Sequence, residues 1–352
     1  MSGYPQFKAA IAHVAPVFLD LTATVDKACS LIAEAARAGA RLIAFPETYV
    51  PAFPVWSSLR SPIHNHDLFC RLAENSMLVP GPELDGVRAA AREHGMLVSL
   101  GFNERSPVSV GCIFNSNVLI DADGSILNHH RKIVPTFYEK LSWAAGDGAG
   151  LRVCDTVCGK VGMLICGENT NPLARYTMMA QGEQVHIASY PPVWPTHDPD
   201  QASNYDLAAA IKLRAGAHSF EAKAFTIVAS SFMDRPMREI LSALDAEAGR
   251  ILDASPRSVS LVTGPGGNTV SEVLCEDEGI LYAEIDVNEC VAPKQIHDVV
   301  GGYNRFDIFQ LTVNRSANRP VCFIDDLDSG DRASCSEESG AGNFETGQAA
   351  DV

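Results

Sequence analysis

The chain has 352 residues, of which 46% are hydrophobic and 20% are charged, and this composition is typical of a globular protein. Its formal net charge of −16 argues against nucleic acid or an anionic membrane as a partner, because binding to phosphate groups depends on clustered lysine and arginine. No apolar run reaches the roughly 18 residues that cross a bilayer, and the opening MSGYPQFKAA lacks a secretory signal pattern, so the sequence predicts a cytoplasmic protein.

Strands and helices are expected to alternate along the first half of the chain, which is typical of an α/β fold. The expected elements are a strand at 7–16, a helix from about residue 24 to a Gly39 cap, a buried strand at 40–47, a helix at 84–94, a strand at 96–104, and a hairpin between 112 and 131 that turns at DADG.

The second half repeats this rhythm. A hairpin is expected to turn near 158–160, and its second strand ends at Cys166. The further expected elements are a helix from Pro172 that stops before Gly182, a strand at 184–190, a helix at about 203–222, a strand at 225–232, and late strands at 258–266 and 279–287.

Two C-terminal segments fall outside this scheme. Residues 303–315 mix aromatic and branched side chains, and they are expected either to cover the domain or to contact a partner subunit. Residues 325–352 are rich in Ser, Gly, Asp and Glu and are predicted to form a disordered acidic tail.

The ten cysteines do not form paired CxxC sets or a dense disulfide pattern, so they are interpreted as reduced thiols. Cys154 and Cys158 lack a matching second ligand pair, and His64 and His66 lack a third ligand. The sequence therefore predicts no metal site.

Cys166 lies where a buried strand gives way to a helix through Gly167. A thiol at such a turn projects into a cleft, and nearby backbone N–H groups can face a developing anion. A helix N-terminus or a neighbouring cation would lower the pKa of the thiol and raise its nucleophilicity. The alternative is a buried cysteine that only fills the core.

Three charged residues also stand at expected strand ends. Glu47 ends the second buried strand, where partial desolvation would raise its pKa toward the range of a general base. Strand alternation turns either Arg131 or Lys132 inward, and Glu139 could hold an inward Lys132 in place. The alternatives are a solvated loop carboxylate and a surface cluster of ion pairs.

The adjacent histidines 129 and 130 offer a different chemistry, a Cys–His dyad. On a strand they face opposite sides, so both cannot enter one site. Ordinary hydrogen-bonded histidines are the favoured interpretation of this pair.

Three segments, FPETYVPAFP, HHRKIVPTFYEKLSWAAGDG and VGMLICGENTNPLAR, resemble in this order the signature blocks of the nitrilase superfamily. The stretches AQGEQVHIASYPPVW and GGYNRFDIFQLTVNR are also nitrilase-like, so the resemblance covers roughly residues 5–315. It implies a four-layer αββα sandwich as a single domain, here residues 1–324, and subunits that dimerise so that two sandwiches stack, with larger spirals also expected.

The resemblance also implies a Glu–Lys–Cys triad, which falls on Glu47, Lys132 and Cys166, with a second glutamate at Glu139. The implied reaction is hydrolysis of a small nitrile by water to a carboxylic acid and ammonia, through a thioimidate and a thioester on Cys166, without a cofactor. Glu47 would shuttle protons, and Lys132 with the Gly167 N–H would stabilise negative charge.

Two positions depart from the common pattern of this superfamily. Gly167 stands where many members carry tryptophan directly after the nucleophile, and the missing ring is expected to leave room beside Cys166. Gly302 stands where histidine is frequent, so no role for that histidine transfers to this chain.

Four aromatic residues flank the signature segments and are expected to wall an apolar pocket: Tyr49, Trp56, Tyr190 and Trp194. Arylacetonitriles, aromatic nitriles and aliphatic dinitriles are the expected substrates, in no order. The alternatives are an amidase or carbamoylase of the same superfamily and, in a different class, a non-catalytic assembly module.

Overall fold

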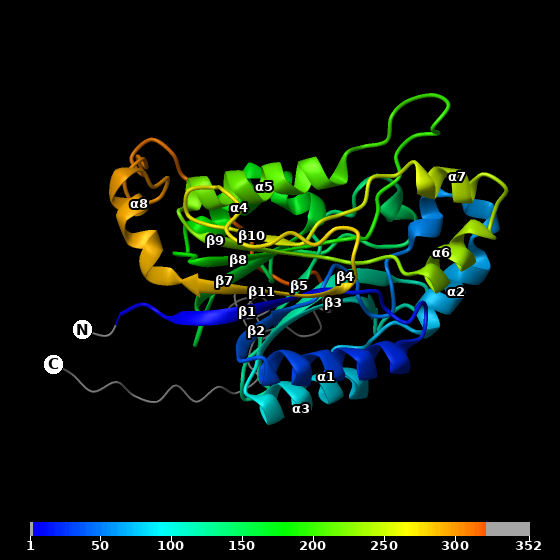
Figure 1. Ribbon diagram of the computed structural model, residues 1–352, viewed down its shortest axis with the longest axis horizontal. Coiled ribbons are helices and arrows are strands. Elements are labelled where there is room, and N and C mark those ends of the chain that lie inside the picture. Colours follow the sequence, from blue (N-terminus) through cyan, green and yellow to red (C-terminus); the bar gives the residue numbers. More distant parts are fainter. Residues whose placement is uncertain (1–2, 322–352) are drawn as a thin grey trace, which may run out of the picture.

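Two β-sheets pack face to face in the computed structural model, which describes residues 3–321, and helices cover the outer side of each sheet (Figure 1). The predicted acidic tail at 325–352 lies outside the described residues. Among the residues that are described, none of the helices is both long and apolar enough to cross a membrane.

The first sheet has the strand order β11-β1-β2-β3-β4-β5, and the second has the order β10-β9-β8-β7-β6. The first sheet consists of β1 (Gln6–His13), β2 (Ala40–Ala44), β3 (Leu97–Arg105), β4 (Ile113–Ile120), β5 (Ile126–Arg131) and β11 (Gly279–Asp286). The second consists of β6 (Cys154–Thr156), β7 (Gly159–Ile165), β8 (Val185–Tyr190), β9 (Phe225–Ser230) and β10 (Leu261–Thr263).

In both sheets three central strands run parallel and the outer strands run antiparallel. The parallel trios are β1-β2-β3 and β7-β8-β9; β2 is the middle strand of the first trio, whereas β7 lies between β8 and the antiparallel edge strand β6. These two strands lead directly to Glu47 and Cys166, which explains how residues far apart in the sequence come together.

Helices α1 (Leu21–Arg37) and α3 (Pro82–His94) cover the first sheet, and α4 (Pro172–Met179) and α5 (Leu207–Ala222) cover the second (Figure 1). The order helix, sheet, sheet, helix is an α/β sandwich, as expected. The remaining helices are α2 (His66–Glu74), α6 (Arg235–Ser242), α7 (Ala248–Asp253), α8 (Val291–Ile296) and the 3-10 helices η1 (Val55–Ser58), η2 (Pro62–His64), η3 (Phe137–Leu141), η4 (Cys166–Thr170) and η5 (Val287–Cys290).

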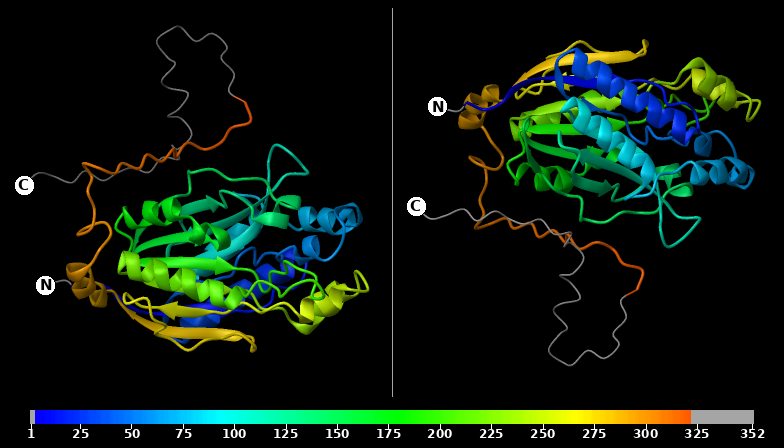
Figure 2. Two further views of the ribbon diagram at one scale, coloured as in Figure 1. Left: turned by 90° about the horizontal axis from the view of Figure 1, so that it is seen from above. Right: turned by 90° about the horizontal axis from the view of Figure 1, so that it is seen from below.

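An apolar core fills the space between the two sheets, where Ile11 and Leu42 of the first sheet share a buried cluster with Met163 and Ile187 of the second. A separate cluster packs α1 and α3 against the outer face of the first sheet. Helices α2, α6 and α7 gather at one end of the sandwich, where their apolar residues share a third cluster (Figure 2). Burial on both faces explains why the parallel strands are continuous apolar runs.

Helix starts differ from the predicted ones because of capping. Asp20 accepts a hydrogen bond from the Ala23 N–H, so α1 begins at Leu21 rather than near residue 24. Asp206 likewise accepts from the Ala209 N–H, and α5 begins at Leu207 rather than at 203. In both cases the first aspartate before the apolar stripe sets the boundary.

Residues 303–315 contain neither helix nor strand, and most of their side chains are exposed. Tyr303 and Phe309 each have 72% of their surface accessible, and Phe306 has 65%. In this single chain the segment leaves aromatic surface uncovered, and Phe306 and Phe309 also line a hollow with Tyr176 of α4, so both of its expected roles stay predictions.

Candidate active site

Lys132 follows β5 directly, and its ammonium lies fully buried between two carboxylates. The Nζ atom is 2.7 Å from Glu47 Oε1 and 2.6 Å from Glu139 Oε2, and none of the three side chains is exposed. Of the two neighbouring cations, Lys132 is the inward one, while Arg131 pairs with Glu104 and keeps 26% of its side chain exposed. Strand alternation therefore correctly predicted that one of the two cations faces inward.

Backbone and amide groups hold both carboxylates in place. Asn115 on β4 donates from Nδ2 to Glu47 Oε1 at 2.7 Å. The Thr136 N–H donates to Glu139 Oε2 at 2.7 Å, as part of a capping box at the start of η3. Each carboxylate thus accepts one bond from Lys132 and one from a rigid neighbour, which limits its motion.

Cys166 is the first residue of η4, and its backbone has a φ of +47°. This left-handed conformation is unusual for a residue other than glycine, and such strain is found at nucleophile turns. The sulfur and one carboxylate oxygen each of Glu47 and Glu139 lie within 4.8 Å of one another. The structure therefore brings together all four residues that the sequence placed in the catalytic group.

Burial and charge determine how these groups are protonated. Burial raises the pKa of Glu47, Lys132 lowers it and Glu139 raises it again, with a result of about 7. Burial alone would lower the pKa of Lys132, but Glu139, Glu47 and Cys166 raise it well above its usual range. Lys132 is therefore a permanent cation, and Glu47 can exchange a proton near neutral pH.

The thiol differs from its expected state. Burial raises the pKa of Cys166 well above its ordinary value, and Glu47 and Glu139 raise it further, while Lys132 and Arg214 lower it. The expectation of a lowered thiol pKa was wrong, because it considered the neighbouring cation without the burial and the two carboxylates. A neutral thiol needs a base at the moment of attack, and Glu47 is within reach.

Glu168 holds the turn that carries Cys166 by accepting hydrogen bonds from backbone N–H groups. Its carboxylate accepts from the Ile165 N–H at 2.7 Å and from the Ile133 N–H at 2.6 Å, and it pairs with His130 at 2.9 Å. His129 pairs with Glu104 instead. Both histidines are thus ordinary hydrogen-bonding partners, as favoured from the sequence, and the Cys–His dyad gains no support.

The four predicted pocket aromatics divide into two pairs. Tyr190 shares a buried cluster with Cys166, and Trp194 packs against the same cluster and stacks on Tyr138 at 5.5 Å. Tyr49 was predicted wrongly: it packs on Phe45 in the core beneath α1 and α3, because the left-handed Thr48 turns the chain there.

Trp56 is outside the Cys166 cluster but shares a buried cluster with Tyr138, against which Trp194 packs, so its place in the pocket stays a prediction. It lies 1% exposed against Phe18, with ring centroids 6.0 Å apart, and it lines a hollow with Pro62, His66 and Phe69. Its flanking position in the sequence gave no information on the direction of its side chain, which η1 sets.

Two residues near the thiol were missed from the sequence. Tyr138 precedes Glu139, is buried, and has its hydroxyl pKa raised by burial and then by Glu139. Arg214 on α5 donates to Thr170 Oγ1 at 2.7 Å and to Tyr205 Oη at 2.8 Å. Only the packing of α5 and η3 brings them to the site, and no local sequence pattern signals it.

Gly167 lines a hollow of about 310 Å³ with residues 133–137, Asn171 and Ala174. A Cβ atom at position 167 would lie 2.7 Å from Thr136 Oγ1, which is closer than van der Waals contact. The expected room is therefore present beside Gly167, but the direction of its own side chain is occupied by Thr136. Glycine allows this close approach of η3 to the nucleophile turn.

Glu47, Glu139 and Cys166 also form a group with metal-ligand spacing. The Lys132 ammonium donates to both carboxylates, so a fixed cation already balances their charge. This donor arrangement suits proton transfer better than metal binding, since a metal would have to displace Lys132.

Comparison with known proteins shows which proteins the chain is similar to. The carbon-nitrogen hydrolase family matches residues 8–295. A protein named nitrilase 3 from an unknown prokaryotic organism is 34% identical over 89% of this chain and 92% of its own length. An arylacetonitrilase from Hypocrea virens is also 34% identical, over 89% of this chain and 93% of its own.

The solved structure of a carbon-nitrogen hydrolase from Helicobacter pylori G27 has a similar fold. It superposes with a TM-score of 0.66 at 20% identity, covering 86% of this chain and 97% of that one. At this identity the likeness concerns the fold alone.

Proposed function

This chain belongs to the carbon-nitrogen hydrolase family, and we propose that it is a nitrilase in which Cys166 attacks the nitrile carbon. The observation that carries the proposal is the convergence of the Cys166 thiol, the Glu47 and Glu139 carboxylates and the Lys132 ammonium in one buried cluster. The proposed catalytic domain is residues 1–324.

The first half of the reaction forms a covalent thioimidate. The Cys166 sulfur bonds to the nitrile carbon while Glu47 accepts the thiol proton and passes it to the nitrile nitrogen, so the triple bond becomes a C=N double bond. Lys132 and the Gly167 N–H stabilise the negative charge that develops on nitrogen. The raised pKa of Glu47 suits this task, because a base of about 7 can also return the proton.

The second half consumes two waters. Glu47 takes a proton from the first water as its oxygen adds to the thioimidate carbon, and passes this proton to the nitrogen. The remaining proton of that water follows to the nitrogen as the C–O bond becomes C=O, and the C–N bond breaks to release ammonia and leave the thioester. A second water then cleaves the C–S bond of the thioester, which releases the carboxylic acid and restores the thiol. If the C–S bond breaks in the first of these steps instead, the product is the amide.

Arylacetonitriles are the substrates that we propose. Phe137, Tyr138 and Trp194 form an aromatic cluster, with ring centroids 5.5–6.4 Å apart, next to Glu139. Phe137 and Tyr138 also line a hollow of about 350 Å³ that extends to Pro195 and Ile251. An aryl ring fits an apolar wall of this kind, and several relatives bear the name arylacetonitrilase.

A panel of phenylacetonitrile, benzonitrile, fumaronitrile and the matching amides, scored by ammonia release, tests the proposal. Phenylacetonitrile is expected to be the fastest, and Cys166→Ala to abolish release from all of them. Cys158→Ala is the matched control, since Cys158 is also a buried thiol but lies in the core between the sheets. Faster release from amides would identify an amidase, and no release from a folded protein would favour an assembly module.

A homo-oligomer in a reducing, cytoplasmic setting completes the proposal. The eight described cysteines are free, which supports a reducing compartment. The exposed aromatic surface of residues 303–315 supports contact with a second copy. Light scattering of the full chain beside a Phe306→Ser, Phe309→Ser variant tests this: an unchanged mass would remove the segment from the interface.

A further inference from the structure

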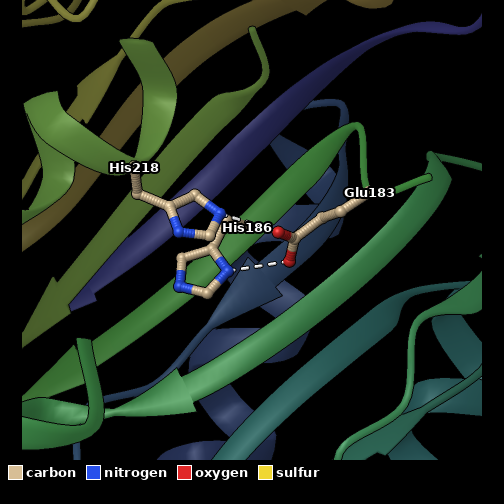
Figure 3. Close-up of side chains that lie close together, drawn as sticks. All are labelled: Glu183, His186 and His218. Atoms are coloured by element: carbon tan, nitrogen blue, oxygen red, sulfur yellow. Dashed lines mark hydrogen bonds and ion pairs between the residues drawn. The ribbon is translucent and has the colours of Figure 1, made fainter. Parts of the chain in front are cut away.

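A ladder of four buried polar residues runs through the second sheet and ends on the backbone of the nucleophile. His218 on α5 and His186 on β8 both reach Glu183, which precedes β8, as Figure 3 shows. His186 Nδ1 lies 2.7 Å from Glu183 Oε1, and His218 Nε2 lies 2.7 Å from Glu183 Oε2. From the other side of the His186 ring, Nε2 lies 2.8 Å from Asn169 Oδ1.

Asn169 connects the ladder to the nucleophile turn. Its Nδ2 donates to the Leu164 carbonyl at 3.2 Å and to the Cys166 carbonyl at 3.1 Å. The opposite amide orientation would direct Oδ1 at two carbonyl oxygens, which only accept, so this orientation is fixed. It follows that Oδ1 accepts from a protonated Nε2 of His186.

The protonation of the ladder follows from this step. His186 Nε2 carries a proton, and its Nδ1 faces the carboxylate of Glu183. Burial alone would raise the pKa of Glu183, but the two histidines lower it to about 2 by charge and hydrogen bonding. Both ring nitrogens of His186 therefore face acceptors, Asn169 Oδ1 on one side and the ionised Glu183 carboxylate on the other, which fixes the ring between them.

His218 takes the neutral form. Burial and the stacked His186 ring, 3.8 Å away, lower the pKa of His218 to about 4. Its Nε2–H donates to Glu183, while Nδ1 is buried and has no partner among the described residues. His218 therefore satisfies the second oxygen of Glu183 without adding charge.

The backbone is shaped to admit this ladder. Gly162 on β7 pairs with His186 on β8, and a Cβ at position 162 would lie 2.1 Å from Glu183 Oε1. Glycine at this position allows the carboxylate to enter the sheet layer and reach both rings.

The end of the ladder has a chemical consequence. The carbonyl of Cys166 and the N–H of Gly167 belong to one planar peptide unit and point in opposite directions. A bond from Asn169 to that carbonyl therefore also sets the direction of the Gly167 N–H, the group that is proposed to face the developing anion. The left-handed φ of Cys166 makes such an external constraint necessary.

We propose that Glu183, His186 and His218 are positioning residues that orient Asn169, and through it the Cys166–Gly167 peptide, so that the Gly167 N–H faces the reacting nitrogen. The inference rests on the proposed function and deepens it. Because Glu183, His186 and His218 have metal-ligand spacing, a metal centre is the competing interpretation. Both nitrogens of His186 are taken by hydrogen bonds, which favours the ladder.

Steady-state kinetics of His186→Leu, His186→Gln and Glu183→Gln test the proposal on phenylacetonitrile, or on the matching amide if the wild type prefers it. Removing one oxyanion donor costs about 10²–10³ in kcat, so a misdirected donor should cost about 10–100-fold, with KM within about threefold. A glutamine Nε2 can replace the histidine Nε2 donor to Asn169, so His186→Gln should recover much of the kcat that His186→Leu loses.

His13→Leu is the matched control, because His13 is an equally buried, hydrogen-bonded histidine that contacts Ser230 and Ser260 instead. It should lower Tm as His186→Leu does and leave kcat unchanged. The rate of Cys166 alkylation by iodoacetamide, which needs no oxyanion donor, should stay within about threefold in every variant and thereby show that the thiol is still in place.

Three results would overturn the ladder: unchanged kcat in His186→Leu, equal losses in His186→Leu and His186→Gln, or stoichiometric metal whose chelation abolishes activity. A wild type that hydrolyses neither nitriles nor amides would instead refute the proposed function on which the ladder rests.

Discussion

Replacing Lys132 with methionine keeps the length of the side chain and removes the ammonium from between two carboxylates that have no exposed surface. Breaking a buried ion pair by removing one partner costs about 3–5 kcal/mol, because the remaining charge stays buried. At about 2 °C per kcal/mol for a chain of this size, Tm should fall by about 6–10 °C. Activity should fall with it, since the substrate nitrogen loses its nearest cation.

The loss of stability should depend on pH, with a sign that follows from Glu47. Lys132 lowers the pKa of Glu47, which remains raised to about 7 by burial, and its removal raises that pKa further. A carboxyl with a raised folded pKa loses stability as pH rises. The deficit of the variant should therefore grow above pH 7, by up to about 1.4 kcal/mol per pH unit for one proton.

Thermal unfolding of wild type and variant at pH 6 and pH 8.5 measures both effects. Lys160→Met is the matched control, because Lys160 pairs with Asp155 at the surface at 3.4 Å, and 45% of its side chain is exposed. Its Tm should stay within about 2 °C, since exposed pairs contribute little. A Lys132→Met Tm within 2 °C of the wild type, or a deficit that is equal at both pH values, would refute the reasoning.

Three further predictions follow from the same geometry. The wild-type kcat/KM should rise with pH through about 7, because only ionised Glu47 accepts the thiol proton. Glu47→Gln should lower kcat by about 10²–10⁴ and abolish this rise with pH. A rise that persists in the variant would contradict the assignment of Glu47 as the base. Gly167→Ala should lower kcat by displacing Thr136, whose Oγ1 would lie 2.7 Å from the new Cβ, and a second change, Thr136→Ala, should restore it in a double-mutant cycle. Glu104→Gln should lower the free energy of unfolding in urea by about 1–3 kcal/mol at pH 7, a modest loss because Arg131 stays partly hydrated. The pKa of folded Glu104 is lowered to about 2, so the difference between wild type and variant should shrink as pH falls below 4.5. A difference that stays constant with pH would refute this reasoning.

The sequence was informative where apolar strands end in charged residues. Glu47, Lys132 and Cys166 each stand at or just after the end of a strand, and alternation then determines which side chain enters the site. The sandwich itself follows from strand runs that are apolar on both faces and from helices with one apolar stripe. These are local patterns, and the structure agrees with them.

The remaining features depend on tertiary packing. The direction of Tyr49 depends on a left-handed residue before it, and the hydrogen bond from Asn115 to Glu47 depends on the register of β4. The sign of the Cys166 pKa shift depends on burial and on two carboxylates from other segments. Helices α2, α6 and α7 are short and are stabilised by the apolar cluster that they share, so their own sequences carry only a weak helical pattern.

Mass spectrometry of the intact enzyme, acid-quenched during turnover of phenylacetonitrile, tests most directly whether Cys166 is the nucleophile. We expect an added mass equal to the nitrile or to the derived acyl group on the peptide that contains Cys166. The adduct should be absent in Cys166→Ala and retained in Cys158→Ala. Turnover that persists in Cys166→Ala, or an adduct on another residue such as the exposed Cys70, would contradict the account.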